Sequence, residues 1–167
     1  MLSDSALLGL PAPAKLNLFL HVVGRRPDGK HLLESVFTLI DLHDTIDLFR
    51  LEEPVVERTG DVIGNVEKDL CVRAARLLME TFDVRSGVRI HVEKRIPAGA
   101  GMGGGSSDAA TVLIGLNRLF GLGLSRSALM ELGERLGADV PFFIFGRTGF
   151  VEGIGAVSYT HLRAHET

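Results

Sequence analysis

The stretch from Lys94 to Thr111 carries the residue types and spacing that most clearly indicate chemistry. It contains five glycines within seven positions, followed by Ser106, Ser107, Asp108 and a run of helix-forming residues. Glycine lets a ligand approach the main chain closely. A loop of free N–H groups that leads into a helix N-terminus attracts anions, because the helix dipole and the unpaired donors both favour negative charge. The stretch therefore predicts a phosphate-binding loop, with the serines and the aspartate at the N-cap or in the first turn of the helix.

Two common phosphate loops do not fit this stretch. A Walker loop requires Gly-Lys-Ser/Thr at the start of the helix, and no lysine lies between Pro97 and Thr111. The loop of protein kinases requires a valine two residues beyond its last glycine, and that position is Ser106 here. The segment also differs from a flexible linker, since an amphipathic helix pattern follows it at once. We therefore expect a phosphate loop of another kind.

The dinucleotide pattern G-x-G-x-x-G is matched by Gly99, Gly101 and Gly104, but the surrounding sequence differs from that of a dinucleotide-binding fold. The strand that leads into such a loop is buried on both faces and is continuously apolar. Residues 88–93 instead alternate between apolar and polar side chains, which is typical of a half-exposed strand. A dinucleotide-binding oxidoreductase is therefore the weakest of the alternatives.

Lys15 and Asn17 form a second candidate site. Residues 13–23 alternate cleanly between apolar and other side chains, which predicts a strand. Lys15 and Asn17 then project from the same side of that strand, one pleat apart. For a lone lysine a solvent-facing position is the commoner case, and strand geometry alone leaves both interpretations open.

Asp139 is the third candidate. It is the only charged residue between Gly137, which we expect to end a helix, and the strongly apolar residues 140–145. A carboxylate at a place where water is partly excluded is either paired for structural reasons or used in chemistry. The position suits a turn or capping aspartate equally well, so the residues alone do not decide between the two.

The elements that must position these candidates follow from the same kind of pattern. Arg25–Gly29 is a strong turn signal, so residues 24–30 should form a hairpin-like loop with Lys30 and His31 at its exit. Further patterns predict strands at residues 32–40 and 45–51 separated by a polar link at 41–44, a helix from Leu70 to about Phe82 capped by Asp69, and a helix that starts at Ser125 or Ser127.

Composition limits the class of protein. The chain has 167 residues, of which 46% are hydrophobic and 23% charged, and its net charge is −3. These values suit one domain and give no electrostatic footprint for nucleic acid. The single cysteine, Cys71, excludes an intrachain disulfide and fits a reducing cytosol. No run of residues has the character of a signal peptide or a membrane span, so we expect a cytoplasmic protein that does not bind a membrane.

Three motifs, in order and at consistent spacing, are Pro13-Ala14-Lys15-Leu16-Asn17-Leu18 with Asp28-Gly29-Lys30-His31 downstream, Pro97 to Ala110, and Leu136 to Phe142. Together they resemble the GHMP kinases, small-molecule kinases whose phosphate loop lacks a Walker lysine. The resemblance covers about Pro11 to Gly155. It implies an α+β fold of the ribosomal protein S5 domain 2 type, in which a mixed sheet is covered by helices.

The resemblance also implies roles for individual residues. ATP, with Mg²⁺ bridging its phosphates, would be held by Pro97, Ala98, Gly99, Ala100, Gly101, Met102, Gly103, Gly104, Gly105, Ser106 and Ser107. Asp139 would be the general base and Lys15 its cationic partner when a substrate hydroxyl attacks the γ-phosphoryl group. The substrate, a cytidine diphosphate-linked polyol of the non-mevalonate route to isoprenoids, would be bound by Asn17, Asp28, Lys30 and His31. No residue is implied as a metal ligand.

Domain boundaries follow from the extent of the resemblance. Residues 1–155 would form an N-terminal, ATP-binding domain, and residues 156–167, which match nothing in the family, are expected to be an unrelated tail that is disordered or artefactual. The family's C-terminal domain would be absent. We therefore expect part of an ATP-dependent small-molecule kinase; another GHMP kinase substrate, or a non-catalytic nucleotide-binding fragment, are the alternatives. The oligomeric state is not predicted.

Overall fold

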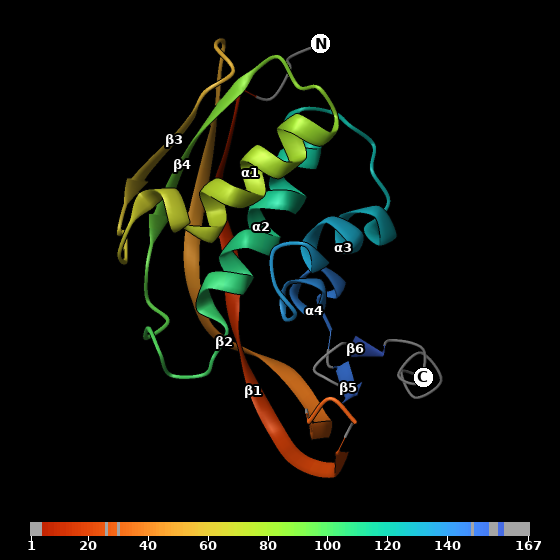
Figure 1. The fold of residues 1–167 in the computed structure, drawn as a ribbon. Coiled ribbons are helices and arrows are strands. Elements are labelled where there is room, and N and C mark those ends of the chain that lie inside the picture. Colours follow the sequence, from red (N-terminus) through yellow and green to blue (C-terminus); the bar gives the residue numbers. More distant parts are fainter. Residues whose placement is uncertain (1–4, 26, 30, 148, 154–156, 159–167) are drawn as a thin grey trace.

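The computed structural model describes residues 5–25, 27–29, 31–147, 149–153 and 157–158. In this part of the chain a mixed sheet lies against a layer of helices (Figure 1). The elements in chain order are β1 (Ala6–Arg25), β2 (His31–Leu51), β3 (Val56–Gly60), η1 (Val66–Lys68), α1 (Leu70–Thr81), β4 (Gly87–Glu93), α2 (Gly104–Leu119), α3 (Arg126–Glu134), α4 (Val140–Phe145), β5 (Gly149–Gly153) and β6 (Val157–Ser158).

The described strands form one six-stranded sheet in the order β3-β4-β2-β5-β6, and β1 also pairs with β2. β3 and β4 run parallel, whereas the other pairs are antiparallel. The long strand β2 pairs with β1, β4 and β5 and therefore joins the two ends of the sheet. This architecture confirms the predicted α+β class, with a mixed sheet covered by helices.

The expected break at residues 41–44 is wrong, because β2 runs without interruption from His31 to Leu51. Within this segment His43 and Asp44 pair with Pro13 and Ala12 of β1. Polar residues do not break the strand here, since the side chain of Asp44 points inward, is fully buried and is satisfied by hydrogen bonds.

The alternation predicted for β1 holds in part. Lys15 and Asn17 lie on the same side, since Lys15 Nζ donates a hydrogen bond to Asn17 Oδ1 at 3.0 Å. The register of β1 against β2 shifts between Pro13 and Lys15 and again between Asn17 and Phe19. Lys15 is only 5% exposed, whereas Leu18 is 61% exposed. A strand that buries its lysine and exposes its leucine departs from the usual arrangement, which directs attention to the surroundings of Lys15.

The predicted helices α1 and α3 are present with their N-caps. Asp69 caps α1 and Ser125 caps α3, each through a side-chain oxygen that accepts backbone N–H bonds. The expected C-cap of α3 at Gly137 is wrong, because the cap is Arg135. Gly137 belongs instead to a turn, in which its N–H donates to the carbonyl oxygen of Gly133 at 3.1 Å and the chain leads directly into α4.

The helix that follows the glycine-rich stretch begins earlier than predicted. α2 starts at Gly104, after Gly103 in a left-handed conformation with φ of 72°, and no side chain caps it. Ser106 and Ser107 lie in its first turn, as predicted, whereas Asp108 lies just beyond that turn and is buried. The glycines that were expected only to form the loop therefore form the first turn of the helix as well.

The hydrophobic core lies between the sheet and the helices. Its largest fully buried side chains are Phe142, Ile46, Leu48, Leu78, Ile90, Leu113, Leu116, Val72, Val88, Val92, Val112 and Val140. The predicted alternation of β4 is confirmed, since Val88, Ile90 and Val92 are buried and Arg89 is exposed. In the described part of the chain, no helix combines the length and apolar character needed to cross a membrane.

Candidate active site

A pocket of about 290 Å³ opens beside the glycine-rich loop. Its lining consists of Arg58, Ile63, Lys68–Cys71, Lys94, Ile96–Gly105 and Asp108. Gly99, Gly101 and Gly103 have φ values of 71°, 72° and 72°, a conformation that side chains rarely allow. Residues 97–101 are exposed, so the loop does not pack inward. Main chain therefore makes up much of the wall of this pocket.

The N-terminus of α2 is part of the same wall. Gly103, Gly104 and Gly105 line the pocket, and the carbonyl oxygen of Gly103 accepts the bond from Ser107 N at 2.8 Å. The amides that precede Ser107 in the helix have no intrahelical carbonyl to bind, and no side chain caps them. An uncapped helix end combines free N–H donors with the positive end of the helix dipole, which is the arrangement that binds phosphate.

Lys15 and Asp139 meet next to this loop, although they are far apart in the sequence. Lys15 Nζ lies 3.9 Å from Asp139 Oδ2. The backbone N of Lys15 donates to the carbonyl oxygen of Met102 at 2.9 Å, which ties β1 to the glycine-rich loop. The side chain of Lys15 is 6% exposed and that of Asp139 is 36% exposed, so the carboxylate at the start of α4 remains open to a ligand.

Aromatic residues pack around Lys15 beside the loop. Lys15 Nζ lies 3.7 Å from the centroid of the Phe37 ring, which provides a cation–π contact. Phe37 packs edge-on against Phe142, which packs edge-on against Phe143. A Cβ atom at Gly103 would lie 2.7 Å from Phe143 Cζ and 3.3 Å from Lys15 Cε. Glycine is therefore required at position 103 for space as well as for its backbone conformation.

The surroundings of Lys15 affect its proton affinity in two opposite ways. Burial lowers the pKa of Lys15, because it removes water from the ammonium group, and the negative charge of Asp139 raises it; the net effect is a lowered pKa. A lysine whose charge is only loosely balanced by one carboxylate at 3.9 Å has electrostatic capacity left for a second anion.

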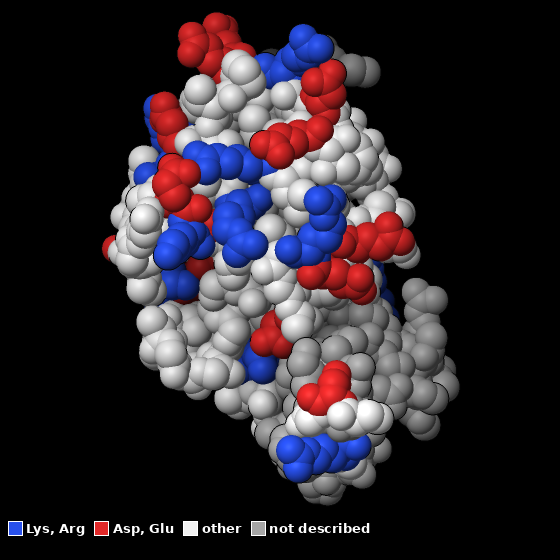
Figure 2. Space-filling model, viewed as in Figure 1, with Lys and Arg blue, Asp and Glu red and all other residues white. Residues whose placement is uncertain are grey.

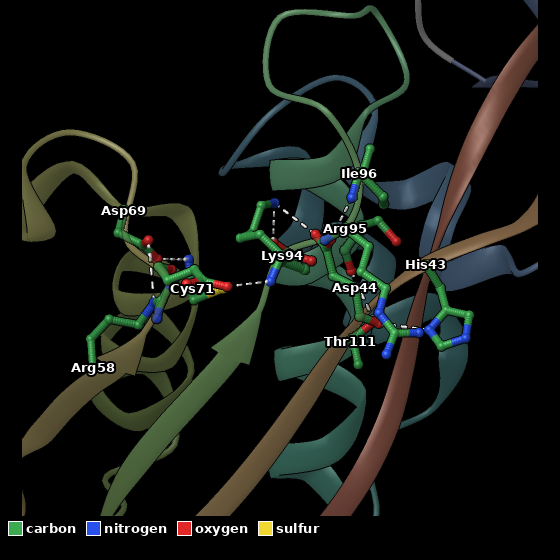
Figure 3. Close-up of polar contacts among 12 residues, drawn as sticks. His43, Asp44, Arg58, Asp69, Cys71, Lys94, Arg95, Ile96 and Thr111 are labelled. Carbon is green, nitrogen blue, oxygen red and sulfur yellow. Dashed lines mark hydrogen bonds and ion pairs between the residues drawn. The ribbon is translucent and has the colours of Figure 1, made fainter.

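A second charged cluster, which sequence reasoning missed, lies at the base of the loop (Figure 3). Lys94 Nζ donates to Asp44 Oδ2 at 2.6 Å and to Asp108 Oδ2 at 2.8 Å. Asp44 Oδ1 accepts the backbone N–H bonds of Arg95 at 2.6 Å and Ile96 at 2.9 Å. The sequence offered only a weak signal for this cluster, because Lys94 stands between two other charged residues, Glu93 and Arg95, and Asp108 fits a cap or first-turn position equally well.

Protons are distributed unevenly within this cluster. Burial, then the hydrogen bond with Asp44, raises the pKa of Asp108 to about 8. Burial alone would raise the pKa of Asp44, but hydrogen bonds from Asp108, the Ile96 amide and Lys94 outweigh it and lower that pKa. Burial alone would lower the pKa of Lys94, but its hydrogen bonds to Asp108 and Asp44 outweigh this effect, so the pKa is raised. Asp108 is thus largely protonated at neutral pH, beside one carboxylate and one ammonium group.

The residues expected to bind substrate are not all brought together. Asn17 is exposed and touches Lys15. Asp28 is exposed in the turn between β1 and β2, at the end of the hairpin beyond the part of the strand that carries Lys15. Lys30 and the side chain of His31 lie outside the described residues, although the backbone of His31 begins β2. Asn17 is therefore the one of the four that the structure joins to the lysine–aspartate pair.

The charges on the face that carries α1 are mixed. Figure 2 shows basic and acidic side chains interspersed there without an extended area of one sign. Such a face differs from the basic patch that nucleic acid requires. Among the described residues, no group of three or more His, Cys, Asp or Glu side chains is arranged to hold a metal ion.

Comparisons with known proteins agree with this geometry. The family model of the GHMP kinases N terminal domain matches residues 69–147. The chain is 60% identical over 146 residues to the 4-diphosphocytidyl-2-C-methyl-D-erythritol kinase of Ralstonia pickettii (strain 12J), covering 87% of this chain and 50% of that relative. It is 61% identical over 149 residues to the kinase of the same name from Polynucleobacter necessarius subsp. necessarius (strain STIR1), covering 89% and 50%.

A solved structure gives the same result. The crystal structure of 4-(cytidine 5'-diphospho)-2C-methyl-D-erythritol kinase matches with a TM-score of 0.78 and 40% identity, over 92% of this chain and 54% of that chain. The chain spans about half the length of the curated relatives it matches. The family and the fold that the three sequence motifs implied are both confirmed. This chain carries a GHMP kinase N-terminal domain.

Proposed function

We propose that the chain is the nucleotide-binding part of an enzyme that transfers the γ-phosphoryl group of ATP to the C2 hydroxyl of 4-diphosphocytidyl-2-C-methyl-D-erythritol. That reaction belongs to the non-mevalonate synthesis of isoprenoid precursors. The observation that carries the proposal is the meeting of Lys15 and Asp139, 3.9 Å apart, beside the uncapped end of α2. The names of the relatives at about 60% identity support the substrate, while the half-length coverage leaves the complete activity as a proposal.

The glycine-rich loop fits the phosphate tail of ATP. Pro97–Ser107 would surround the tail, with main-chain N–H groups of the loop and of the first turn of α2 as donors. The fit rests on the uncapped helix end and on glycines that leave the main chain accessible. Mg²⁺ would be bound by the phosphate oxygens and would neutralise charge on the transferred group. The chain's own part is to hold the nucleotide and orient its terminal phosphate.

Asp139 and Lys15 would perform the proton transfer and the charge stabilisation. Asp139 Oδ2 accepts the proton of the substrate hydroxyl, whose oxygen then bonds to the γ-phosphorus as the bond to the ADP oxygen breaks. Lys15 stabilises negative charge on the attacking oxygen and on the phosphoryl group, and it keeps Asp139 ionised. Phosphoryl transfer depends mainly on positioning and electrostatics, which is what this pair beside the loop supplies.

Residues of the β1–β2 hairpin would bind the acceptor substrate. Asn17 would hydrogen-bond the polyol next to Lys15, and Asp28, Lys30 and His31 would contact the cytidine diphosphate part. The contact between Lys15 and Asn17 at 3.0 Å supports the first assignment. The other three remain predictions from the family resemblance.

The test determines which acceptor molecule the protein phosphorylates. The purified chain is incubated with ATP, Mg²⁺ and 4-diphosphocytidyl-2-C-methyl-D-erythritol, with the full-length kinase of Ralstonia pickettii (strain 12J) as the positive control, and the products are identified by mass spectrometry. We expect ADP and one singly phosphorylated product. Mevalonate, homoserine and galactose serve as comparison acceptors, because phosphorylation of one of these in preference would assign another GHMP kinase activity.

A second candidate follows from the length of the chain. Because it spans about half of its relatives, it can bind nucleotide without completing the reaction. ATP binding measured by calorimetry, with no ADP release by the chain under conditions in which the full-length relative turns over, would support this candidate. Turnover by the 167 residues alone would refute it. The separation of residues 156–167 from the domain also remains a proposal; of these, Val157 and Ser158 form β6.

A further inference from the structure

The charged cluster of Asp44, Lys94 and Asp108 joins the two ends of the glycine-rich loop. Lys94 lies where the loop leaves β4, and Asp108 lies in α2 just after the loop ends. The ammonium group of Lys94 binds both of its aspartates, at 2.6 Å and 2.8 Å. One side chain thus connects the start of the loop to the helix that follows it, and Asp44 supports that connection from the central strand β2.

Hydrogen bonds tie the Asp44 carboxylate to residues at the start of the loop. Oδ1 accepts two backbone N–H bonds, from Arg95 and Ile96, and Oδ2 accepts the bond of Lys94. Asp44 is fully buried in the middle of a strand, where an ionised carboxylate is costly unless it is satisfied in this way. Its contacts do not support the pairing of its own strand, so strand stability alone does not explain the residue.

We propose that Asp44 is a positioning residue for nucleotide binding: with Lys94 it fixes both ends of the glycine-rich loop, so that the loop amides are ordered before ATP arrives. The inference rests on the proposed function, since it takes the loop as the phosphate site. Preordering matters because a loop that must become ordered on binding loses affinity by the entropy of that ordering.

The charge of the cluster adds a second, measurable consequence. The charged groups that act on Asp108 are Lys94, just after β4, and Asp44 on β2, and the Cys71 thiol of α1 also lies near it, with Asp69 and Arg58 on the other side of that thiol. Burial raises the pKa of the Cys71 thiol well above its usual range, so this group stays neutral. With the pKa of Asp108 raised to about 8, a rise from pH 7 to pH 9 ionises this carboxyl and adds a negative charge to the wall of the phosphate pocket.

The test measures ATP affinity by calorimetry on the purified chain at pH 7, with Asp44→Ala, Asp44→Asn and the control Asp47→Ala. Asp47 is on the same strand and its Oδ1 accepts a backbone bond from Gly9 at 2.7 Å, away from the loop. We expect Asp44→Ala to weaken ATP by about tenfold or more, as for the loss of a charged hydrogen bond. Asp44→Asn keeps an acceptor for both amides but not the charge for Lys94, so its loss should be smaller; Asp47→Ala should bind like wild type.

The pH dependence provides a test that is independent of stability. Wild-type affinity for ATP should fall between pH 7 and pH 9, and the fall should be smaller in Asp108→Asn, whose side chain cannot ionise. Hydrogen exchange of the Arg95 and Ile96 amides in the absence of ATP should be slow in wild type and faster in Asp44→Ala. If Asp44→Ala fails to fold, Asp44→Asn still decides the matter, through its ATP affinity and the exchange of the Arg95 and Ile96 amides.

Two results would overturn the proposal. One is ATP affinity within twofold of wild type for both Asp44 variants when each is folded, which would leave Asp44 a purely structural role. The other is equally slow hydrogen exchange of the Arg95 and Ile96 amides in wild type and in the folded Asp44 variants, which would mean that Asp44 does not order the start of the loop. Failure of the proposed function gives a different pattern, in which no variant, nor the wild type, binds ATP at any pH while the amide exchange still responds to Asp44.

Discussion

Two lysine–aspartate sites flank the glycine-rich loop, and they are built in opposite ways. Lys15 and Asp139 are 3.9 Å apart, and the carboxylate side chain is 36% exposed. Lys94 and Asp44 are 2.6 Å apart, and the carboxylate is fully buried and accepts bonds from Lys94 and from two loop amides. Their lysines also differ, since the pKa of Lys15 is lowered mainly by burial, whereas that of Lys94 is raised by its two carboxyl partners against the effect of burial.

The difference shows which pair is available for chemistry. A carboxylate whose two oxygens both accept structural hydrogen bonds, and which has no access to solvent, cannot accept a proton from a substrate without weakening those bonds. A half-open carboxylate at a longer distance can do so, and its lysine can turn toward an arriving phosphate. The closed cluster of Lys94 with Asp44 and Asp108 thus fixes the base of the loop. The open pair, Lys15 and Asp139, lies beside the loop and is the one available for chemistry.

The largest effect that separates the two sites is on the chemical step. Measured on protein that catalyses the phosphoryl transfer, Asp139→Asn should lower kcat by about 10²–10⁴-fold, the range for loss of a general base. ATP affinity and melting temperature should stay near wild type, because the carboxylate is loosely paired. Steady-state kinetics and thermal melting are measured side by side. A kcat within tenfold of wild type would remove Asp139 from the role of base.

The second effect is on stability and belongs to the closed cluster. Asp44→Ala should destabilise the chain by about 2–3 kcal/mol, since it leaves two backbone donors and part of the Lys94 charge unpaired. Chemical denaturation measures this, with Asp139→Ala as the matched control at the open pair. If the two alanine variants lose equal stability, the distinction between an open and a closed pair does not hold.

The sequence could predict the open pair but not the closed cluster, for physical reasons. The period of two in β1 placed Lys15 and Asn17 on one side, and the isolated charge of Asp139 before an apolar run marked it as unusual. Only the family resemblance assigned the pair to one site. Asp44 resembled a turn residue within a polar segment, and its partner Lys94 lies fifty positions further along the chain, so no local pattern joins them.

The same limit applies to the elements around the loop. Asp69 and Ser125 were recognisable caps, because capping is decided within a few residues. The start of α2 at Gly104 was missed, since glycine is a poor helix former and only tertiary packing, here beneath Ile96 and Lys94, makes it the first turn. Helix caps can thus be predicted from neighbouring residues, whereas the start of α2 depends on packing against residues that no local pattern identifies.

A third experiment compares the two lysines directly. With ¹³C-labelled lysine, the Cε chemical shifts of Lys15 and Lys94 followed against pH should show Lys15 losing its proton at a lower pH than Lys94. As pH rises, Lys15 is therefore neutralised before Lys94, and turnover should fall on the alkaline side while Lys94 still holds its aspartate partners. Asp139→Asn should lower the pKa of Lys15 further, because the negative charge that raises it is gone. Titration of Lys94 before Lys15 would contradict the assignment of the open and closed sites.

The smallest expected effect comes from an exposed ion pair, which tests whether short distance or burial makes an ion pair stabilising. Arg76 and Glu67 are 2.6 Å apart, the same as Lys94 and Asp44, but their side chains are 44% and 67% exposed. Water and salt screen such a pair, so Glu67→Gln should leave the melting temperature unchanged in physiological salt, although the Arg76 hydrogen bond lowers the pKa of Glu67. Asp44→Asn, also a neutral isostere, should lower it clearly under the same conditions. Equal losses would mean that short distance alone makes a stabilising pair; a loss confined to Asp44 assigns the effect to burial and to the loop amides that this carboxylate holds.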